Sequence, residues 1–170
     1  MNNYKIEKLN PFGAVIQNCG EVNSVEQFTK AEIFDLISEH QAIVFRGYET
    51  LSKQQLALFA QGLGEPLQWA FGAINDLKFK PDTENYIFTH HAVPFHWDGA
   101  FAGKIPHIIL FQCIIPPHKE DFGGTTFCDT AKIVQNADSV RLQKWKEISI
   151  TYTTEKIVHY GGKVTQTFLQ

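Results

Sequence analysis

The spacing of apolar residues changes near residue 66, and this change restricts the chain to a fold with both helices and sheets. Before that point, residues 29–40 (TKAEIFDLISEH) and 52–66 (SKQQLALFAQGLGEP) each begin with a capping box, in which Thr or Ser is followed three residues later by Glu or Gln. Apolar side chains then recur at helical spacing, and Gly64 is a typical helix stop. We predict two helices, separated by a short strand in residues 42–48 (AIVFRGY).

The rest of the chain has a different pattern. Short segments rich in Ile, Phe, Thr and Tyr are separated by Pro, Gly and acidic turns, which is typical of strands. We predict strands in residues 85–97, 107–115, 123–130, 148–156 and 161–170. Residues 129–148 predict a helix or a pair of short helical turns that begin near Asp129 or Ser139. The fold class is therefore α+β, with N-terminal helices that lean on a sandwich-like antiparallel core.

Size and charge limit the classes of function. A chain of 170 residues fits one domain, so we expect a single domain over residues 1–170. No apolar run approaches the roughly 20 residues of a membrane span, and the first residues do not resemble a secretory signal. The three cysteines lack C-x-x-C spacing, which favours free thiols in the cytoplasm. With a net charge of −3 and scattered basic residues, we expect a small-molecule ligand, no nucleic acid and no membrane.

The chemically informative stretch is VPFHWDGAF, residues 93–101. It puts His96 and Asp98 two apart among apolar and aromatic neighbours, where a charge is costly unless it is paired. If this stretch is a strand, residues two apart share a face, so both side chains could reach one point while Trp97 turns the other way. A histidine with a carboxylate is two thirds of the facial triad that holds non-haem Fe(II). An H-x-D pair alone is a weak motif, and an ordinary polar strand is the alternative.

A longer series of motifs strengthens the metal hypothesis. The segments NPFGAVI, HQAIVFRGY, FAQGLGEP, FHWDGAF and GGTTFCDT resemble, in order and approximate spacing, the TauD/TfdA (taurine dioxygenase) family of Fe(II)- and 2-oxoglutarate-dependent oxygenases. Three longer segments are most similar in sequence to the isonitrile-biosynthesis branch of that family: LQWAFGAI, NYIFTHHAVPFHWDGAF and VHYGGKV. The resemblance covers nearly the whole chain.

The resemblance implies a fold, cofactors and site residues. The fold would be a double-stranded β-helix, or jelly roll, with N-terminal helices. His96 and Asp98 would be two of the iron ligands, and Thr126, with its neighbour Thr125, would bind a carboxylate of 2-oxoglutarate. The activity implied is oxidation of a small, amino-acid-derived isonitrile with release of succinate and CO2. Four aromatic residues are candidates for a pocket lining, although each is also an ordinary core residue: Trp69, Phe71, Phe95 and Phe101.

The sequence departs from the family pattern in its last part. The family has a third iron ligand, a histidine far downstream, and an arginine that binds the other carboxylate of 2-oxoglutarate. His159 and Arg141 are the nearest candidates, and neither lies in a matching segment. The remaining histidines fit ordinary strand or loop positions: His90, His91, His107 and His118. We therefore expect a C-terminally truncated domain whose jelly roll is incomplete.

Three hypotheses follow from these observations. The first is an Fe(II)/2-oxoglutarate dioxygenase whose third ligand has another source. The second is a non-catalytic family remnant, a β-rich oligomeric or binding protein that holds iron weakly. The third is a cupin-like metal protein, whose metal binding would not depend on 2-oxoglutarate. The unpaired N–H and C=O groups of an edge strand can pair with another chain, so we also expect the chain to form homo-oligomers through exposed β edges.

Overall fold

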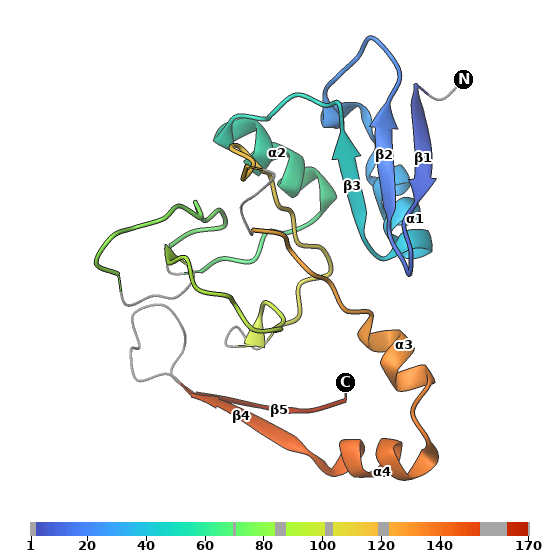
Figure 1. Ribbon diagram of the computed structural model, residues 1–170, viewed down its shortest axis with the longest axis vertical. Helices are drawn as coiled ribbons and strands as arrows, with labels where there is room; N and C mark the ends of the chain where they lie inside the picture. The colour runs from blue at the N-terminus through green and yellow to red at the C-terminus, as the bar shows by residue number, and fades with distance from the viewer. Residues whose placement is uncertain are drawn as a thin grey trace. The chain divides into compact units, whose positions relative to one another are not determined.

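The computed structural model describes residues 3–69, 71–83, 88–100, 104–118, 123–153 and 163–169. The chain divides into two units, one of Met1–Glu65 with Leu110–Ala137 and one of Pro66–Ile109 with Asp138–Gln170. Within the described ranges each unit has a sheet of its own (Figure 1). None of the helices in these ranges has the length and apolar character that a membrane crossing requires.

The first unit combines a mixed sheet with short helices. Its elements are β1 (Tyr4–Lys8), β2 (Ala14–Asn18), the 3₁₀ turn η1 (Val25–Gln27), α1 (Lys30–His40), β3 (Ile43–Arg46), α2 (Lys53–Leu63) and α3 (Thr130–Gln135). The sheet order is β1-β2-β3, with β1 antiparallel and β3 parallel to β2. A parallel pair requires a crossover connection, and α1 supplies it.

Both predicted N-terminal helices and their capping boxes are confirmed. The Thr29 hydroxyl accepts from the Glu32 N–H, and the Glu32 carboxylate accepts from the Thr29 N–H. Ser52 and Gln55 make the same reciprocal pair at the start of α2. The backbone N–H of Gly64 caps the end of α2, as expected for a helix stop. The predicted strand between the helices is also confirmed, as β3.

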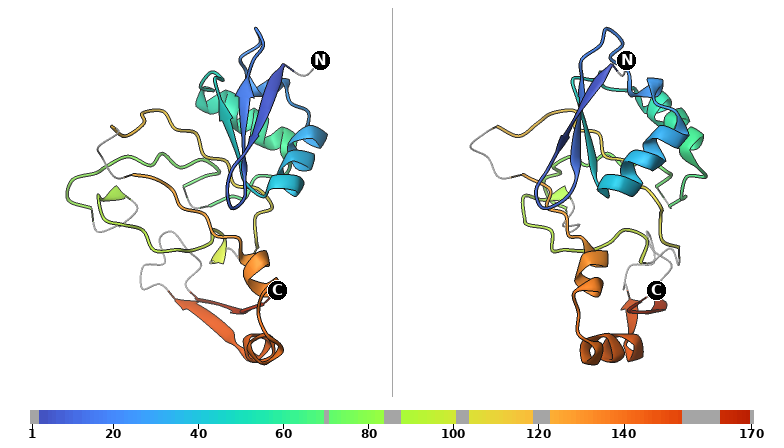
Figure 2. Two further views of the ribbon diagram at one scale, coloured as in Figure 1. Left: turned by 45° about the vertical axis from the view of Figure 1, so that its right-hand side comes forward. Right: turned by 90° about the vertical axis from the view of Figure 1, so that its right-hand side faces the viewer.

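The core of the first unit lies between its sheet and α1. Ala14 and Ile16 alternate onto one face of β2, and both are fully buried. Ile33 and Leu36 lie on the buried side of α1, which covers a face of the sheet (Figures 1 and 2). Burial of a side chain such as Ile16 or Ile33 is worth about 1.5–3 kcal/mol, so the buried side chains of sheet and helix stabilise this unit.

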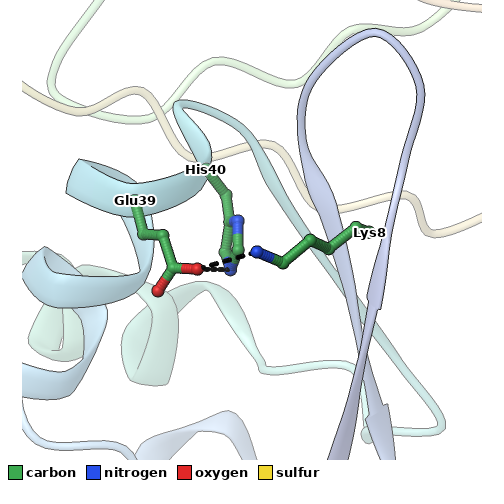
Figure 3. Close-up of polar contacts among 3 residues, drawn as sticks. All are labelled: Lys8, Glu39 and His40. Atoms are coloured by element: carbon green, nitrogen blue, oxygen red, sulfur yellow. Dashed lines mark hydrogen bonds and ion pairs between the residues drawn. The ribbon is translucent and has the colours of Figure 1, made fainter.

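A polar cluster links β1 to the end of α1. Lys8 Nζ donates to Glu39 Oε1 at 3.1 Å, and the same oxygen lies 3.7 Å from His40 Nε2 (Figure 3). His40 is only 5% exposed, whereas Lys8 and Glu39 are exposed. The Lys8 hydrogen bond, followed by the charges of His40 and Lys8, lowers the pKa of Glu39. The carboxylate therefore remains ionised as it joins strand and helix.

The second unit contains a helix and a two-stranded hairpin. α4 (Ser139–Glu147) leads directly into β4 (Ser149–Thr153), which pairs antiparallel with β5 (Lys163–Thr167). The Phe168 ring packs edge-on against Trp145 of α4, with ring centroids 6.0 Å apart. Of the two alternatives predicted for residues 129–148, a single helix or a pair of short helical turns, α3 and α4 confirm the pair. The two C-terminal strands are confirmed within the described ranges.

The strands predicted for the middle of the chain are not present in its described residues. Within residues 88–100, 104–118 and 123–129 the structure has no strand, although parts of all three were predicted as strands. Residues 85–87 of the first predicted strand lie outside the described ranges. Strand propensity depends on the partner that a segment finds, and Pro94, inside the first predicted strand, lacks the N–H that a ladder needs. In this part of the structure, the side-chain amide of Gln112 instead pairs with the backbone of Leu51. It accepts from the Leu51 N–H and donates to the Leu51 carbonyl oxygen, each at 2.8 Å.

Candidate metal centre

The predicted metal ligands lie in a loop of the second unit. Residues 96–100, called here the ligand loop, contain a turn at Asp98 and Gly99 and no strand. The expectation that strand alternation brings His96 and Asp98 together is therefore wrong in its geometry. The turn nevertheless brings the two side chains together, with His96 Nε2 3.8 Å from Asp98 Oδ1.

The imidazole of His96 is oriented by its own backbone. Nδ1 lies 2.9 Å from the carbonyl oxygen of Pro94, and because a carbonyl only accepts, Nδ1 must carry the proton. Nε2 of the neutral ring then has a free lone pair on the side of Asp98. This is the usual arrangement of a metal-binding histidine, whose second nitrogen donates to a carbonyl or carboxylate.

The separation of the two ligand atoms suits a shared ion. Nitrogen and oxygen ligands lie about 2.1 Å from a transition metal, so two of them can be at most about 4.2 Å apart. The observed 3.8 Å is inside that limit, but adjacent positions of an octahedral site are about 3.0 Å apart, so the two side chains must close by about 0.8 Å to act as neighbouring ligands of a facial triad. Both side chains are about half exposed, at 52% for His96 and 47% for Asp98, so an ion can reach them from solvent. The donor set fits Fe(II), to which imidazole and carboxylate are ordinary ligands.

The end of the ligand loop, at Gly99 and Ala100, is buried and tightly turned. Gly99 has φ +108°, a conformation that favours glycine, and Ala100 is 8% exposed. A Cβ on Gly99 would press against the backbone oxygen of Lys104 and lie 2.8 Å from Pro106 Cδ. The ligands thus project from a buried turn that accepts no larger residue at this position.

Two side chains of the hairpin contact the ligand loop, and the sequence analysis missed both. Tyr152 of β4 accepts a hydrogen bond from Trp97 Nε1 at 3.2 Å, with the two rings edge-on. Gln166 of β5 donates to the carbonyl oxygen of Ala100 at 2.9 Å. The available signal was the alternation along the two C-terminal strands, which puts these residues on one face. Their target could not be inferred without the loop's path.

A third metal ligand is not found in the described part of the chain. No group of three His, Cys, Asp or Glu residues there could hold a metal ion. His90 stacks on Phe79, with ring centroids 4.1 Å apart, and Arg141 lies in α4, where it pairs with Asp138 at 3.5 Å. His159 lies outside the described residues. The site as described therefore has two protein ligands.

The predicted 2-oxoglutarate residues belong to the first unit. Thr125 and Thr126 are exposed and lie in a segment without strand or helix. Of the aromatic residues named as pocket candidates, Trp69 and Phe71 stack on each other at 6.0 Å, and Phe95 is 73% exposed. Phe101 lies outside the described residues. The roles of the two threonines and of the aromatic residues stay predictions.

Comparison with known proteins identifies relatives along nearly the whole chain. The profile of the "Taurine catabolism dioxygenase TauD, TfdA family" matches residues 5–167. The chain is 37% identical over 166 residues to 3-((Z)-2-isocyanoethenyl)-1H-indole synthase of Fischerella ambigua, covering 98% of this chain and 61% of that protein. It is 32% identical over 129 residues to tyrosine isonitrile desaturase of Pseudomonas aeruginosa, covering 75% of this chain and 44% of that protein.

Two solved structures of PvcB have a similar fold. PvcB from Pseudomonas aeruginosa superposes with a TM-score of 0.77 at 25% identity, over 98% of this chain and 60% of PvcB. A second PvcB structure, described as that of an Fe, alpha-ketoglutarate dependent oxygenase from an isonitrile synthetic pathway, gives 0.75 at 24% identity, over 98% of this chain and 61% of PvcB. This chain therefore spans about three fifths of the length of PvcB and of the Fischerella relative.

These comparisons confirm the identification made from the motifs, including its similarity to proteins of isonitrile biosynthesis. Over residues 5–167, the chain belongs to the TauD, TfdA family.

Proposed function

We propose that this chain functions in an Fe(II)- and 2-oxoglutarate-dependent dioxygenase that oxidises a small, amino-acid-derived isonitrile and releases succinate and CO2. The observation that carries the proposal is the His96–Asp98 pair, in which Nε2 and Oδ1 are close enough to bind one ion. The names of the relatives supply the substrate class, since they are an isocyanoethenyl-indole synthase and a tyrosine isonitrile desaturase.

The protein's own residues have separate tasks in this proposal. His96 and Asp98 hold Fe(II), and the Pro94 carbonyl keeps the histidine in the tautomer that offers Nε2 to the metal. The Thr126 hydroxyl, with Thr125 beside it, donates to a carboxylate of 2-oxoglutarate. Iron with 2-oxoglutarate supplies the oxidising chemistry, which consumes O2. One oxygenase domain over residues 1–170 with a jelly-roll core is supported by the single family match and by the likeness to PvcB.

A second candidate function is supported by the two-residue ligand set found in the described part of the chain. Because the described residues contain no group of three metal-binding side chains, this chain is expected to hold metal weakly by itself. In that case it acts as a non-catalytic family member, an oligomeric or binding protein. A cytoplasmic location, and partners that exclude nucleic acid and membranes, stay predictions from composition.

The deciding experiment is an anaerobic titration of the purified chain with Fe(II) and 2-oxoglutarate. The dioxygenase proposal expects a weak visible charge-transfer band that requires both components and disappears in His96→Ala. His91→Ala is the matched control, because His91 is an exposed histidine of the same unit. A folded chain without the band supports the non-catalytic alternative, and metal binding that does not respond to 2-oxoglutarate supports the cupin-like one.

The role of Thr126 is tested in the same titration. Thr126→Val removes one hydroxyl and keeps the shape, and a hydrogen bond to a charged group is worth about 1.5–3 kcal/mol. We expect the affinity for 2-oxoglutarate to fall by a factor of about 10–100, while binding of metal alone is unchanged. Equal 2-oxoglutarate affinity in the wild type and the variant would contradict this role.

A further inference from the structure

The hairpin of the second unit presents two different faces. Its register pairs Tyr152 with Val164 and Ile150 with Gln166, so these four residues share one face. All four are half-buried, whereas their neighbours along both strands are exposed. On the exposed face, the Thr151 and Thr165 hydroxyls bond each other at 2.9 Å. One face of the hairpin is therefore packed, and the other is open.

The packed face contacts both ends of the turn that carries Asp98. Trp97, which lies between the two metal ligands in sequence, donates to the Tyr152 hydroxyl at 3.2 Å. Ala100, two residues after Asp98, accepts from Gln166 at 2.9 Å. The two contacts come from different strands. The hairpin register fixes the positions of Tyr152 and Gln166 relative to each other. The turn between them is held at two points.

We propose that Tyr152 and Gln166 are positioning residues for the metal site, and that they hold the ligand loop so that His96 Nε2 and Asp98 Oδ1 stay within reach of one ion. This inference rests on the proposed metal-binding function. Neither residue touches the metal, and each acts through a neighbour of a ligand. Outer contacts of this kind matter because a loop, unlike a strand, has no ladder hydrogen bonds to fix its side chains.

The geometry of the loop explains why two contacts are needed. His96 and Asp98 are half exposed, and the His96 ring is oriented by its bond to the carbonyl oxygen of Pro94, two residues earlier in the chain. Such a local bond orients the ring but does not fix it relative to Asp98. With Trp97 and Ala100 both held by the hairpin, the backbone on each side of Asp98 is fixed. The separation of the two ligand atoms is then set by the hairpin.

The test uses two variants from different strands and one control. Tyr152→Phe removes the hydroxyl that accepts from Trp97 and retains the ring contact. Gln166→Met removes the donor to Ala100 at nearly the same side-chain length. Thr165→Val is the matched control, because it breaks a hydrogen bond of the same hairpin on the open face. If one variant fails to fold, the other, which acts from a different strand, still decides.

Two readouts are measured on the full chain. The first is amide hydrogen exchange of residues 96–100, followed by mass spectrometry without metal. The second is the dissociation constant for Co(II), followed by visible absorption, with His96→Ala to identify binding at the site. We expect exchange in the ligand loop to become several-fold faster in both variants and the Co(II) dissociation constant to rise about 10-fold or more. The control should change neither quantity.

The outcomes separate the inference from the function on which it rests. Unchanged exchange in both variants would overturn the inference, as would faster exchange with unchanged Co(II) affinity. Equal effects in Thr165→Val would also overturn it, because general weakening of the hairpin would then suffice. If the wild type binds no Co(II) through His96, the proposed metal site fails, while faster exchange in the two variants would still support the positioning of the loop by the hairpin.

Discussion

At the residue scale, the backbone of Gly99 decides whether the ligand loop can form. Its φ of +108° is costly for residues with a Cβ, and the site is buried against Lys104 and Pro106. The sequence marked this glycine only as the residue after Asp98. The structure shows why the position matters, because the turn that brings Asp98 back toward His96 passes through it.

We predict that Gly99→Ala destabilises the chain and disrupts the metal site. Strained backbone of this kind costs about 1–3 kcal/mol, and the contact with Lys104 adds to it. Urea unfolding should show the loss in the free energy of unfolding, and Co(II) titration should show weaker binding. Gly62→Ala in α2 is the control, since a Cβ there meets no atom within 4 Å among the described residues. It should stabilise by up to about 1 kcal/mol through helix propensity. Equal effects of the two substitutions would contradict the prediction.

At the element scale, α1 is held by carboxylates at both of its ends. Hydrogen bonds from the Thr29 backbone and then from its side chain lower the pKa of Glu32 below the ordinary value of 4.5. At the other end, the hydrogen bond from Lys8 lowers the pKa of Glu39 (Figure 3). A carboxyl group with a lowered pKa in the folded state stabilises the fold above its unfolded pKa, and this stabilisation is lost as the pH falls through the folded pKa.

We predict that the contribution of Glu32 disappears in acid. Glu32→Gln retains the capping-box geometry, since Gln55 occupies the equivalent position in α2, but it removes the charge. Wild type should be more stable than the variant near pH 7, and the difference should shrink as the pH falls below about 4.5. The measurement is the free energy of unfolding against pH for both proteins. A difference that does not change with pH would contradict the lowered pKa.

At the scale of the whole molecule, exposed apolar surface and unpaired strand edges favour association. Within the described ranges, β4 and β5 pair only with each other, and β1 and β3 each have one unpaired edge. Phe111, Ile114 and Ile115 are 64%, 65% and 85% exposed. Contiguous exposure of this kind is uncommon in monomers and is typical of contact surfaces.

We predict concentration-dependent self-association of the chain. Light scattering with size-exclusion chromatography should give a mass above 19.3 kDa that rises with concentration. Ile115→Lys should reduce the association, since a buried lysine is costly in an apolar contact. Leu58→Lys on α2 is the control, because Leu58 is likewise exposed, at 57%, but lies outside residues 111–115. A monodisperse monomer at moderate concentration would contradict the prediction.

A feature could be predicted from the sequence when the residues that form it lie close together along the chain. Both capping boxes, the Gly64 stop and the C-terminal hairpin strands were predictable, because each depends on residues within a few positions of one another or on simple alternation. The strands predicted at residues 107–115 and 123–130 were wrong, because a strand exists only where a second segment completes its ladder. Apolar composition cannot specify that partner.

The sequence by itself determined the family, the α+β class and the identity of His96 and Asp98 as a possible ligand pair, because residue types and short spacings carry that information. Only the tertiary structure decided that the pair meets in a turn, with Nδ1 of His96 on Pro94 and Nε2 3.8 Å from Asp98. It also decided that Tyr152 and Gln166, more than 50 residues away along the chain, hold the turn. The physical reason is that a side chain's direction depends on the path of the backbone, and distant contacts fix that path.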